Sequence, residues 1–282
     1  MSQVVEQAHI DKVLSGLKIP PQPTILTELR KEQAKTEPDL KIFADLISKD
    51  VALSAAVLKT INSPFFGMRR EIRSIQQATM LLGLINVVNL VTGLVLRHSF
   101  GGQASISMES FWDTATEIAN VSFVVASRLD VPNPDECYML GLFHDCGIAV
   151  FAQKYPDYKQ IFDQRFDHGK ILTDLEDQRY HTNHTVIGYY LAKSWHLPEP
   201  VTQAILAHHD PADLFGRADD QHRRNQLLGV LRIALTFSFQ CHQASTEDHE
   251  WERVADEVLQ YFGLTGQEFE DLRSDLLAMM RS

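Results

Sequence analysis

The chain has 282 residues, of which 44% are hydrophobic and 22% charged, a composition typical of a globular protein that can bury a substantial core. Its formal net charge of -11 at pH 7 would be repelled by phosphate backbones, so we expect no nucleic-acid partner. The 3 cysteines fit neither a disulfide framework nor a CxxC metal or redox motif.

The N-terminal residues lack the basic and apolar segments of a signal peptide. The most apolar run, residues 80–96, falls short of the ~20 residues that a membrane-spanning helix needs. Asn86 and Asn89 within that run would also be costly in lipid. We therefore interpret residues 80–96 as a buried core helix and expect a cytoplasmic protein with no membrane partner.

The first third of the chain predicts helices separated by breaks. Residues 19–23, IPPQP, form a rigid non-helical segment, because successive prolines fix φ and remove amide donors. Apolar residues at helical spacing then predict helices over residues 24–34, 37–50 and 52–62. Pro38 is placed in the first turn of the second helix. A loop, SPFFGMRREIRSI, follows, and in it Ser74 is a plausible N-cap of a helix that Gly83 ends.

From about residue 109 the helical pattern dominates. Helices are predicted over residues 110–129, 135–155, 174–195, 197–210 and 224–240, with two more in the tail. No alternating period-2 pattern persists, so no sheet is expected. We predict an all-α, two-lobed helical bundle, with an N-terminal lobe at residues 1–105, a second lobe at 106–215 and a C-terminal helical extension at 216–282.

Histidine and aspartate stand side by side at His144 and Asp145, inside the glycine-bracketed apolar segment GLFHDCG. The chain has 12 histidines, and the informative subset is His144, His181, His184, His196, His208 and His209. Imidazole nitrogen and carboxylate oxygen are the ligands that suit a divalent transition metal. These residues therefore predict a metal site on neighbouring helices.

Helical spacing decides which histidines face inward. His184 lies in line with Ile187 and Leu191 on one helical face. In the helix 197–210, the inward stripe continues to either His208 or His209, because three and four steps both return to the same face. The alternative interpretation is structural: a buried histidine can donate to a backbone carbonyl, and a buried aspartate can cap a helix.

Several motifs in order resemble an HDOD domain, a relative of the HD-domain metal-dependent phosphohydrolases. They are IPPQP, LISKDVALSAAVLKTINSPFFG, IRSIQQATMLLG, FW at 111–112, GLFHDCG, HTVIGYYLAKSW and HLPEPVTQAILAHH. Each motif alone is weak, and their ordered run over roughly residues 19–212 is the signal. The resemblance implies an HD-like core in the second lobe, whereas the region after about residue 220 resembles no family that we can name.

The resemblance also implies a set of metal ligands: His144, Asp145, His184, His208 and His209. Competent HD hydrolases carry a first ligand histidine on the preceding helix, where this chain has Thr114, and a late aspartate on the helix after the His-His pair, which here has none. Asp113 or Glu117 could replace the first ligand. The Gly-Tyr-Pro segment of HD-GYP phosphodiesterases is missing, which disfavours cyclic-dinucleotide hydrolysis.

Two functions follow from this incomplete set. The first is a non-catalytic bacterial signalling module of HDOD type, with no cofactor expected beyond a weakly bound divalent metal, acting through a protein partner. Its contact surface would include the loop 64–67, which could instead plug the two lobes together. The alternative is a phosphohydrolase for a small phosphorylated compound, with Asp145 as its catalytic ligand. Against it, no Arg or Lys cluster is evident, and Lys154 and Lys193 are exposed by pattern. A third option is a metal that only stabilises the fold.

Overall fold

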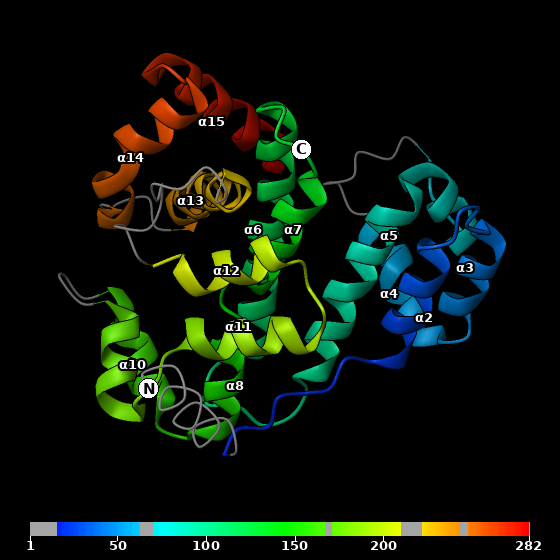
Figure 1. Ribbon diagram of the computed structural model, residues 1–282, viewed down its shortest axis with the longest axis horizontal. Coiled ribbons are helices and arrows are strands. Elements are labelled where there is room, and N and C mark those ends of the chain that lie inside the picture. The colour runs from blue at the N-terminus through cyan, green and yellow to red at the C-terminus, as the bar shows by residue number, and fades with distance from the viewer. Residues whose placement is uncertain (1–15, 63–69, 167–170, 210–221, 243–247, 282) are drawn as a thin grey trace. The chain divides into compact units, whose positions relative to one another are not determined.

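The computed structural model describes residues 16–62, 70–166, 171–209, 222–242 and 248–281, and these fold into helices with no strand among them (Figure 1). The all-α prediction is therefore confirmed. The chain forms two compact units, one of residues 22–99 and 263–282, the other of residues up to 21 and 100–262. The division of the sequence at residues 105 and 215 stays a prediction.

The smaller unit consists of α2 (Thr24–Gln33), α3 (Leu40–Ser48), α4 (Val51–Ile61), α5 (Ile75–Ser99) and α15 (Gly266–Arg281). Aspartates cap two of its helices: Asp39 accepts from the backbone N–H of Lys41 at 2.7 Å, and Asp50 accepts from Leu53 at 3.0 Å. Pro38 consequently precedes the cap of α3 and does not lie in its first turn, contrary to our prediction.

Helix α5 is long and apolar enough, by length and composition alone, to cross a membrane. Ser74 caps it by accepting from the N–H of Gln77 at 3.2 Å, and Gly83 interrupts it with a φ of 80°, so both predictions for these residues are confirmed. After Gly83 the helix packs as core, and Val87 and Val91 are fully buried. Before and just after Gly83, however, Met80, Leu81 and Ile85 are exposed, so the prediction of a buried core helix over 80–96 is confirmed from Val87 onward and wrong before it.

The larger unit holds the candidate ligands His144, His184, His208 and His209. Its elements are α6 (Met108–Arg128), α7 (Pro134–Phe143), α8 (Cys146–Lys154), α9 (Tyr158–Phe162), the 3₁₀ helix η2 (Asp163–Phe166), α10 (Leu172–Tyr180), α11 (His184–Ser194), α12 (Glu199–Ala207), α13 (His222–His242) and α14 (His249–Phe262). Helix α6 packs against α7 and α13, and α11 packs against both α8 and α12. The non-helical segment at residues 18–23 is confirmed, and the indole N–H of Trp195 binds the carbonyl of Pro20 at 2.8 Å.

Two segments that we predicted as single helices are each divided into two helices by a turn. Residues 135–155 form α7 and α8, with the His144–Asp145 pair between them. Residues 174–195 form α10 and α11, because His181 adopts a left-handed φ of 59° and Asn183 caps the new helix by accepting from Val186 N–H at 3.2 Å. Both breaks redirect the chain, so that functional side chains lie at helix ends.

Close backbone approach seats α8 against α11. A Cβ added to Gly147 would lie 2.0 Å from the carbonyl oxygen of His184, closer than any side chain can tolerate. Gly188 faces this contact from α11, where an added Cβ would lie 3.6 Å from the backbone nitrogen of Gly147. The glycine after the His-Asp pair therefore lets the start of α11, and with it His184, approach Asp145.

Candidate metal centre

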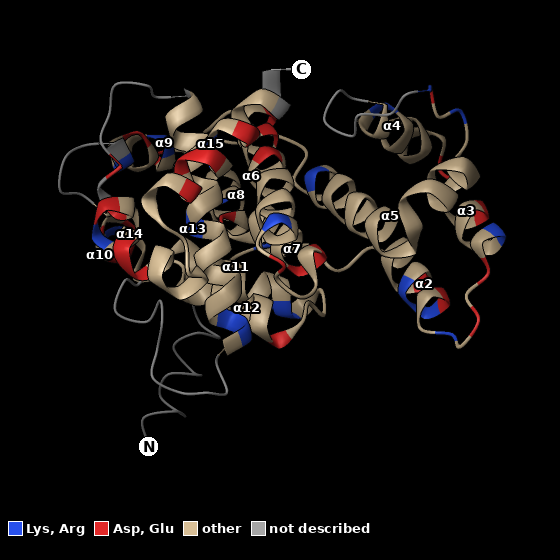
Figure 2. Ribbon diagram, turned by 90° about the horizontal axis from the view of Figure 1, so that it is seen from above, with Lys and Arg blue, Asp and Glu red and all other residues tan. Residues whose placement is uncertain are grey.

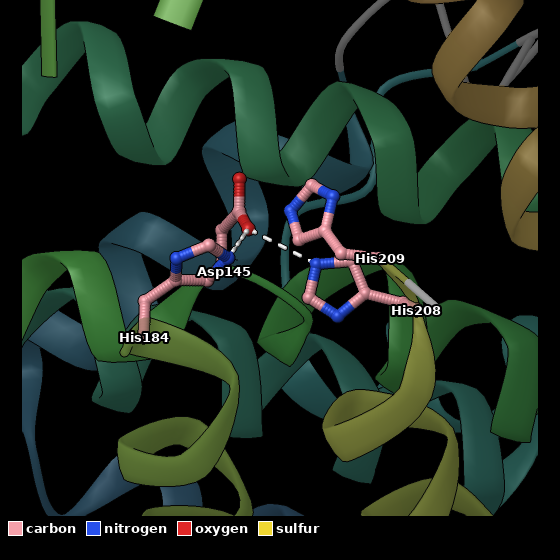
Figure 3. A group of neighbouring side chains, drawn as sticks. All are labelled: Asp145, His184, His208 and His209. Carbon is pink, nitrogen blue, oxygen red and sulfur yellow. Dashed lines mark ion pairs between the residues drawn. The ribbon is translucent and has the colours of Figure 1, made fainter. Parts of the chain in front are cut away.

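Side chains from three helix ends converge on Asp145, which lies in the turn between α7 and α8. His184 is the first residue of α11, and His208 and His209 follow the last turn of α12. Figure 3 shows these three rings gathered around the carboxylate. One nitrogen or oxygen atom from each of the four residues lies within 4.8 Å of the others.

Three imidazole nitrogens surround the Asp145 carboxylate at the same distance. Its Oδ1 lies 3.4 Å from Nε2 of His184 and 3.4 Å from Nε2 of His208. Its Oδ2 lies 3.4 Å from Nε2 of His144. The rings of His144, His184 and His208 are all buried, at no more than 3% exposure. Of the two alternatives that we predicted, His208 therefore continues the inward-facing stripe, and His209 is partly exposed.

The other ring nitrogens assign the tautomers. Nδ1 of His144 lies 2.8 Å from the carbonyl of Gly141, and Nδ1 of His208 lies 2.7 Å from that of Ile205. Carbonyl oxygens only accept, so each Nδ1 carries a proton and donates it. In the neutral ring, Nε2 then presents a lone pair toward Asp145.

His184 is oriented in the same sense by a carboxylate, because its Nδ1 lies 2.6 Å from Oε2 of Glu176. Asp145 Oδ1, His184 Nε2 and His208 Nε2 are buried and have no hydrogen-bond partner among the described residues. When Nε2 of His184 is unprotonated, these inward-facing acceptors form the arrangement that a cation would satisfy.

The ionisable groups of the cluster shift one another's pKa values. Burial lowers the pKa of His184, but the adjacent Glu176 and Asp145 carboxylates outweigh burial and raise it to about 8. Burial, together with the neighbouring His209, lowers the pKa of His208 to about 3. Burial raises the pKa of Asp145, but His144, His208 and His184 hold it well below its usual range. Without a metal, a proton on His184 therefore supplies the cationic charge beside Asp145.

The donor set fits one divalent transition metal. Imidazole nitrogens of His184, His208 and His209 and a carboxylate oxygen of Asp145 lie within 4.8 Å of one another, and Nε2 of His144 faces the second carboxylate oxygen at 3.4 Å. His209 is less committed: its ring is 20% exposed, and its Nδ1 lies 3.1 Å from Oε1 of Glu250 on α14. The predicted ligands are thus brought together, whereas His181 and His196 lie exposed at left-handed positions after α10 and α11.

Within the part of the chain that the structure describes, the two ligand positions that the sequence lacks are not filled by Asp113, Glu117 or helix α13. Thr114 lines the cavity beside the cluster, but Asp113 and Glu117 do not, and Glu117 accepts from the hydroxyl of Ser238 at 2.8 Å. Helix α13 carries no acidic residue and contributes Arg232 to the cavity. The guanidinium of Arg232 binds both the carbonyl of His208 and the carboxylate of Glu250.

A cavity of about 630 Å³ opens beside the cluster, within the larger unit. Its lining includes four cationic side chains: Lys159, Arg165, Arg232 and Arg253. Our prediction that no Arg or Lys cluster lies near the histidines is therefore wrong. Lys154 and Lys193 do not line the cavity; the first binds the carbonyl of Gly16, and the second lies over the ring of Tyr189.

The carboxylates that line this cavity, other than Asp145, have partners among the described residues. Asp163 pairs with Lys159 at 2.6 Å, and Glu250 pairs with Arg232. Asp248 accepts from the hydroxyl of Thr236 at 2.9 Å. Acidic residues are numerous on α14, as Figure 2 shows, yet of these only Glu250 lines the cavity. Asp145 is therefore the one lining carboxylate with a buried oxygen that has no hydrogen bond.

Comparison with known proteins agrees with the motifs. A family model described as HDOD domain matches residues 19–211. The chain is 29% identical over 201 residues to an uncharacterized protein of Treponema pallidum (strain Nichols); the match covers 68% of this chain and 38% of that protein. The chain thus spans well under half the length of this curated relative.

Solved structures share the fold. A presumptive phosphohydrolase from Shewanella amazonensis SB2B superposes with a TM-score of 0.73 at 20% identity, covering 97% of this chain and 93% of that one. A presumptive signal transduction protein from Marinobacter aquaeolei VT8 superposes with a TM-score of 0.68 at 18% identity, covering 100% of this chain and 67% of that one. At such identities the likeness shows a common fold.

Proposed function

The chain belongs to the HDOD domain family, and on that premise we propose that it is a bacterial signalling module that acts through a protein partner and does not hydrolyse phosphate esters. A cytoplasmic location, with no nucleic-acid or membrane partner, belongs to the same proposal. The His-Asp centre in this proposal binds at most one divalent cation. The fold and the family are compatible with both signalling and hydrolysis, so the residues of the site must distinguish these two functions.

The observation that carries the proposal is the single available carboxylate. A bridged pair of metals in a hydrolase needs several anionic ligands to offset the charge and to hold both ions ~3.5–4 Å apart. Among the described residues that line the cavity, Asp145 alone has a buried carboxylate oxygen without a hydrogen bond, while Asp163 and Glu250 are paired with cations. Thr114 occupies the position expected for the first ligand. Helix α13, where the last ligand is expected, contains no Asp or Glu.

Arg232 opposes a second cation directly. Its side chain is 8% exposed, lines the same cavity and binds the backbone of His208, one of the candidate ligands. Its guanidinium charge, partly offset by the paired Glu250, lies close to a metal ligand and raises the free energy of a further divalent ion through like-charge repulsion. A single bound cation would itself be a Lewis acid, and it would stabilise the packing of the residues that hold it.

Exposed apolar side chains support a protein partner. Met80, Leu81 and Ile85 of α5 are 67%, 62% and 48% exposed, and such large apolar groups in one stretch are typical of contact surfaces. The loop 64–67, our other candidate surface, lies outside the described residues. The Marinobacter protein of the same fold carries a signal-transduction name, which also favours this role.

The alternative function is a metal-dependent phosphohydrolase. The four cationic side chains that line the cavity favour it, because Arg and Lys are the usual partners of phosphate oxygens. The name of the Shewanella protein points in the same direction. Two of these cations, Lys159 and Arg232, are already paired with carboxylates, which weakens that argument.

Metal analysis and turnover distinguish the two functions. Protein purified without a histidine tag is analysed for metal, and hydrolysis of bis(p-nitrophenyl) phosphate is measured with added Mn²⁺. We expect no more than one metal ion per chain and no turnover above an Asp145→Ala control. Two metal ions per chain, or turnover that Asp145→Ala abolishes, would establish the hydrolase and end the proposal.

A further inference from the structure

Glu176 of α10 is a carboxylate with no exposed surface that makes three hydrogen bonds. Its Oε2 accepts from the backbone N–H of His184 at 2.8 Å and from the ring Nδ1 of the same residue at 2.6 Å. Its Oε1 accepts from the hydroxyl of Tyr158, which is also fully buried. Both oxygens are thus occupied, and every donor lies in the larger unit.

This arrangement holds His184 at two points. The backbone bond fixes the start of α11, and the ring bond fixes the rotation of the imidazole about its side-chain torsions. A ring held through Nδ1 can direct only Nε2 elsewhere, and Nε2 lies 3.4 Å from Asp145 Oδ1. Tyr158 in turn orients the Glu176 carboxylate by a hydrogen bond, and Glu176 orients the ring of His184.

A helix cap or a packing contact would not need this construction. Asn183 caps α11 by accepting from Val186 N–H, and Glu176 accepts the N–H of His184, but neither of these capping bonds requires the further bond from Glu176 to the ring Nδ1 of His184. Burying a carboxylate is costly unless it is paired and hydrogen-bonded, and the ring of His184 is one of the partners that Glu176 uses. A carboxylate that accepts from the rear nitrogen of a ligand histidine raises the basicity of the front nitrogen and fixes its tautomer.

We infer that Glu176, oriented by Tyr158, is a positioning residue that aims Nε2 of His184 at Asp145 and sets the affinity of the cluster for a divalent cation. The inference rests on the proposed single-cation centre. Neither residue touches the cation; each acts through His184. Loss of such an outer partner typically weakens metal binding by about 10–100-fold.

The test is titration of the full-length, chelator-stripped protein with Co²⁺, followed by calorimetry and by the visible absorption of the bound ion. Glu176→Gln keeps the shape and one acceptor but removes the negative charge, and we expect a dissociation constant about 10–100-fold higher. Tyr158→Phe removes only the outermost hydrogen bond, and we expect a smaller increase, below about tenfold.

Glu32→Gln is the matched control. Glu32 is a buried carboxylate of the other unit, 4% exposed, that also accepts a backbone N–H, from Asp39 at 3.0 Å, and binds a side chain, Lys35. We expect it to leave the Co²⁺ affinity within twofold of the native value. Thermal unfolding in EDTA, measured on all three variants, separates a loss of fold stability from a loss of affinity.

Three results would overturn the inference: native protein that binds no Co²⁺, a folded Glu176→Gln variant with native affinity, or an equal loss in Glu32→Gln. If Glu176→Gln fails to fold, Tyr158→Phe decides in its place, and native affinity in that variant counts against the inference. Phosphodiester turnover by the native protein would overturn the proposed function but leave the role of Glu176 intact, so the two failures are distinguishable.

Discussion

His184 and His209 belong to the same cluster but have opposite surroundings. The ring of His184 is fully buried and held by Glu176, itself with no exposed surface. The ring of His209 is 20% exposed and faces Glu250, whose side chain is 41% exposed. The partner of His184 lies inside the matched family segment 19–211, whereas Glu250 and Arg232 lie beyond it.

The difference separates a rigid side of the centre from an adjustable one. On the His184 side, buried hydrogen bonds and close backbone contact leave no room for rearrangement, because protein interiors are densely packed. On the His209 side, an ion pair from the C-terminal helices α13 and α14 reaches into the cavity, and a partly exposed pair contributes little energy. Metal affinity should therefore depend on the first side, and the second can vary.

The largest expected effect breaks the rigid side at its backbone contact. In Gly147→Ala the new Cβ would lie 2.0 Å from the His184 carbonyl oxygen, so α8 and α11 must separate. We expect the free energy of unfolding to fall by about 3 kcal/mol or more, measured by urea denaturation. Gly266→Ala is the control, because no atom lies within 4 Å of a Cβ there. Equal stability of both variants would contradict the close contact.

Truncation of the two histidines tests the comparison itself. We expect His184→Ala to weaken Co²⁺ binding by about 100-fold or more, since it removes a buried ligand nitrogen. We expect His209→Ala to weaken it by less than about tenfold, because that ring is already engaged by Glu250. The measurement is the same calorimetric titration, and comparable losses in both variants would erase the distinction between the two sides.

The pH dependence of stability, measured in EDTA, reports the same buried groups. The pKa of His184 is raised from 6.5 to about 8, so the folded state binds the extra proton and stability falls by about 2 kcal/mol as pH rises through this range. The pKa of His208 is lowered to about 3, so the unfolded state binds the extra proton and stability falls as pH drops below 6.5.

We therefore expect the stability of the metal-free protein to be greatest near pH 6.5. Urea denaturation across the pH range measures it, and His184→Gln should remove the decline on the alkaline side. A native protein that gains stability between pH 6.5 and 8 would show that His184 does not carry the proton.

The smallest effect is expected on the adjustable side. Glu250→Gln removes the negative charge that faces Arg232 and His209 but keeps one oxygen as a hydrogen-bond acceptor. We expect a loss of about 1 kcal/mol in the free energy of unfolding and a change in Co²⁺ affinity of less than about threefold. A tenfold change in affinity would mean that His209 and its partner control the centre after all.

Part of the site was predictable from local pattern, and part was not. His144, Asp145, His184 and His208 were predicted, because helical spacing and the motif order depend on neighbours in sequence. Glu176 was not, since nothing in LEDQRY distinguishes a buried carboxylate from a solvated one. Arg232 offered a signal, a single charge within the apolar run LLGVLRIALTF, but its target lies 24 residues away at His208.

The broken helices illustrate the same limit. Apolar periodicity runs through residues 135–155 and 174–195, so it predicts one helix in each. The turns at Asp145 and His181 depend on which helix end packs against which, and periodicity contains no information about that. The number of apolar residues in this run likewise could not predict that Met80 and Leu81 are exposed.

The all-α class and the order of most helices follow from local spacing, and the family and the residues around Asp145 follow from the resemblance of the ordered motifs. Contacts in the folded chain were needed to learn which ring nitrogen faces the carboxylate, which charges are already paired and which side of the centre is rigid. Those features are set by contacts between segments far apart in the chain, and hydrogen bonds and desolvation act only after packing has brought the groups together.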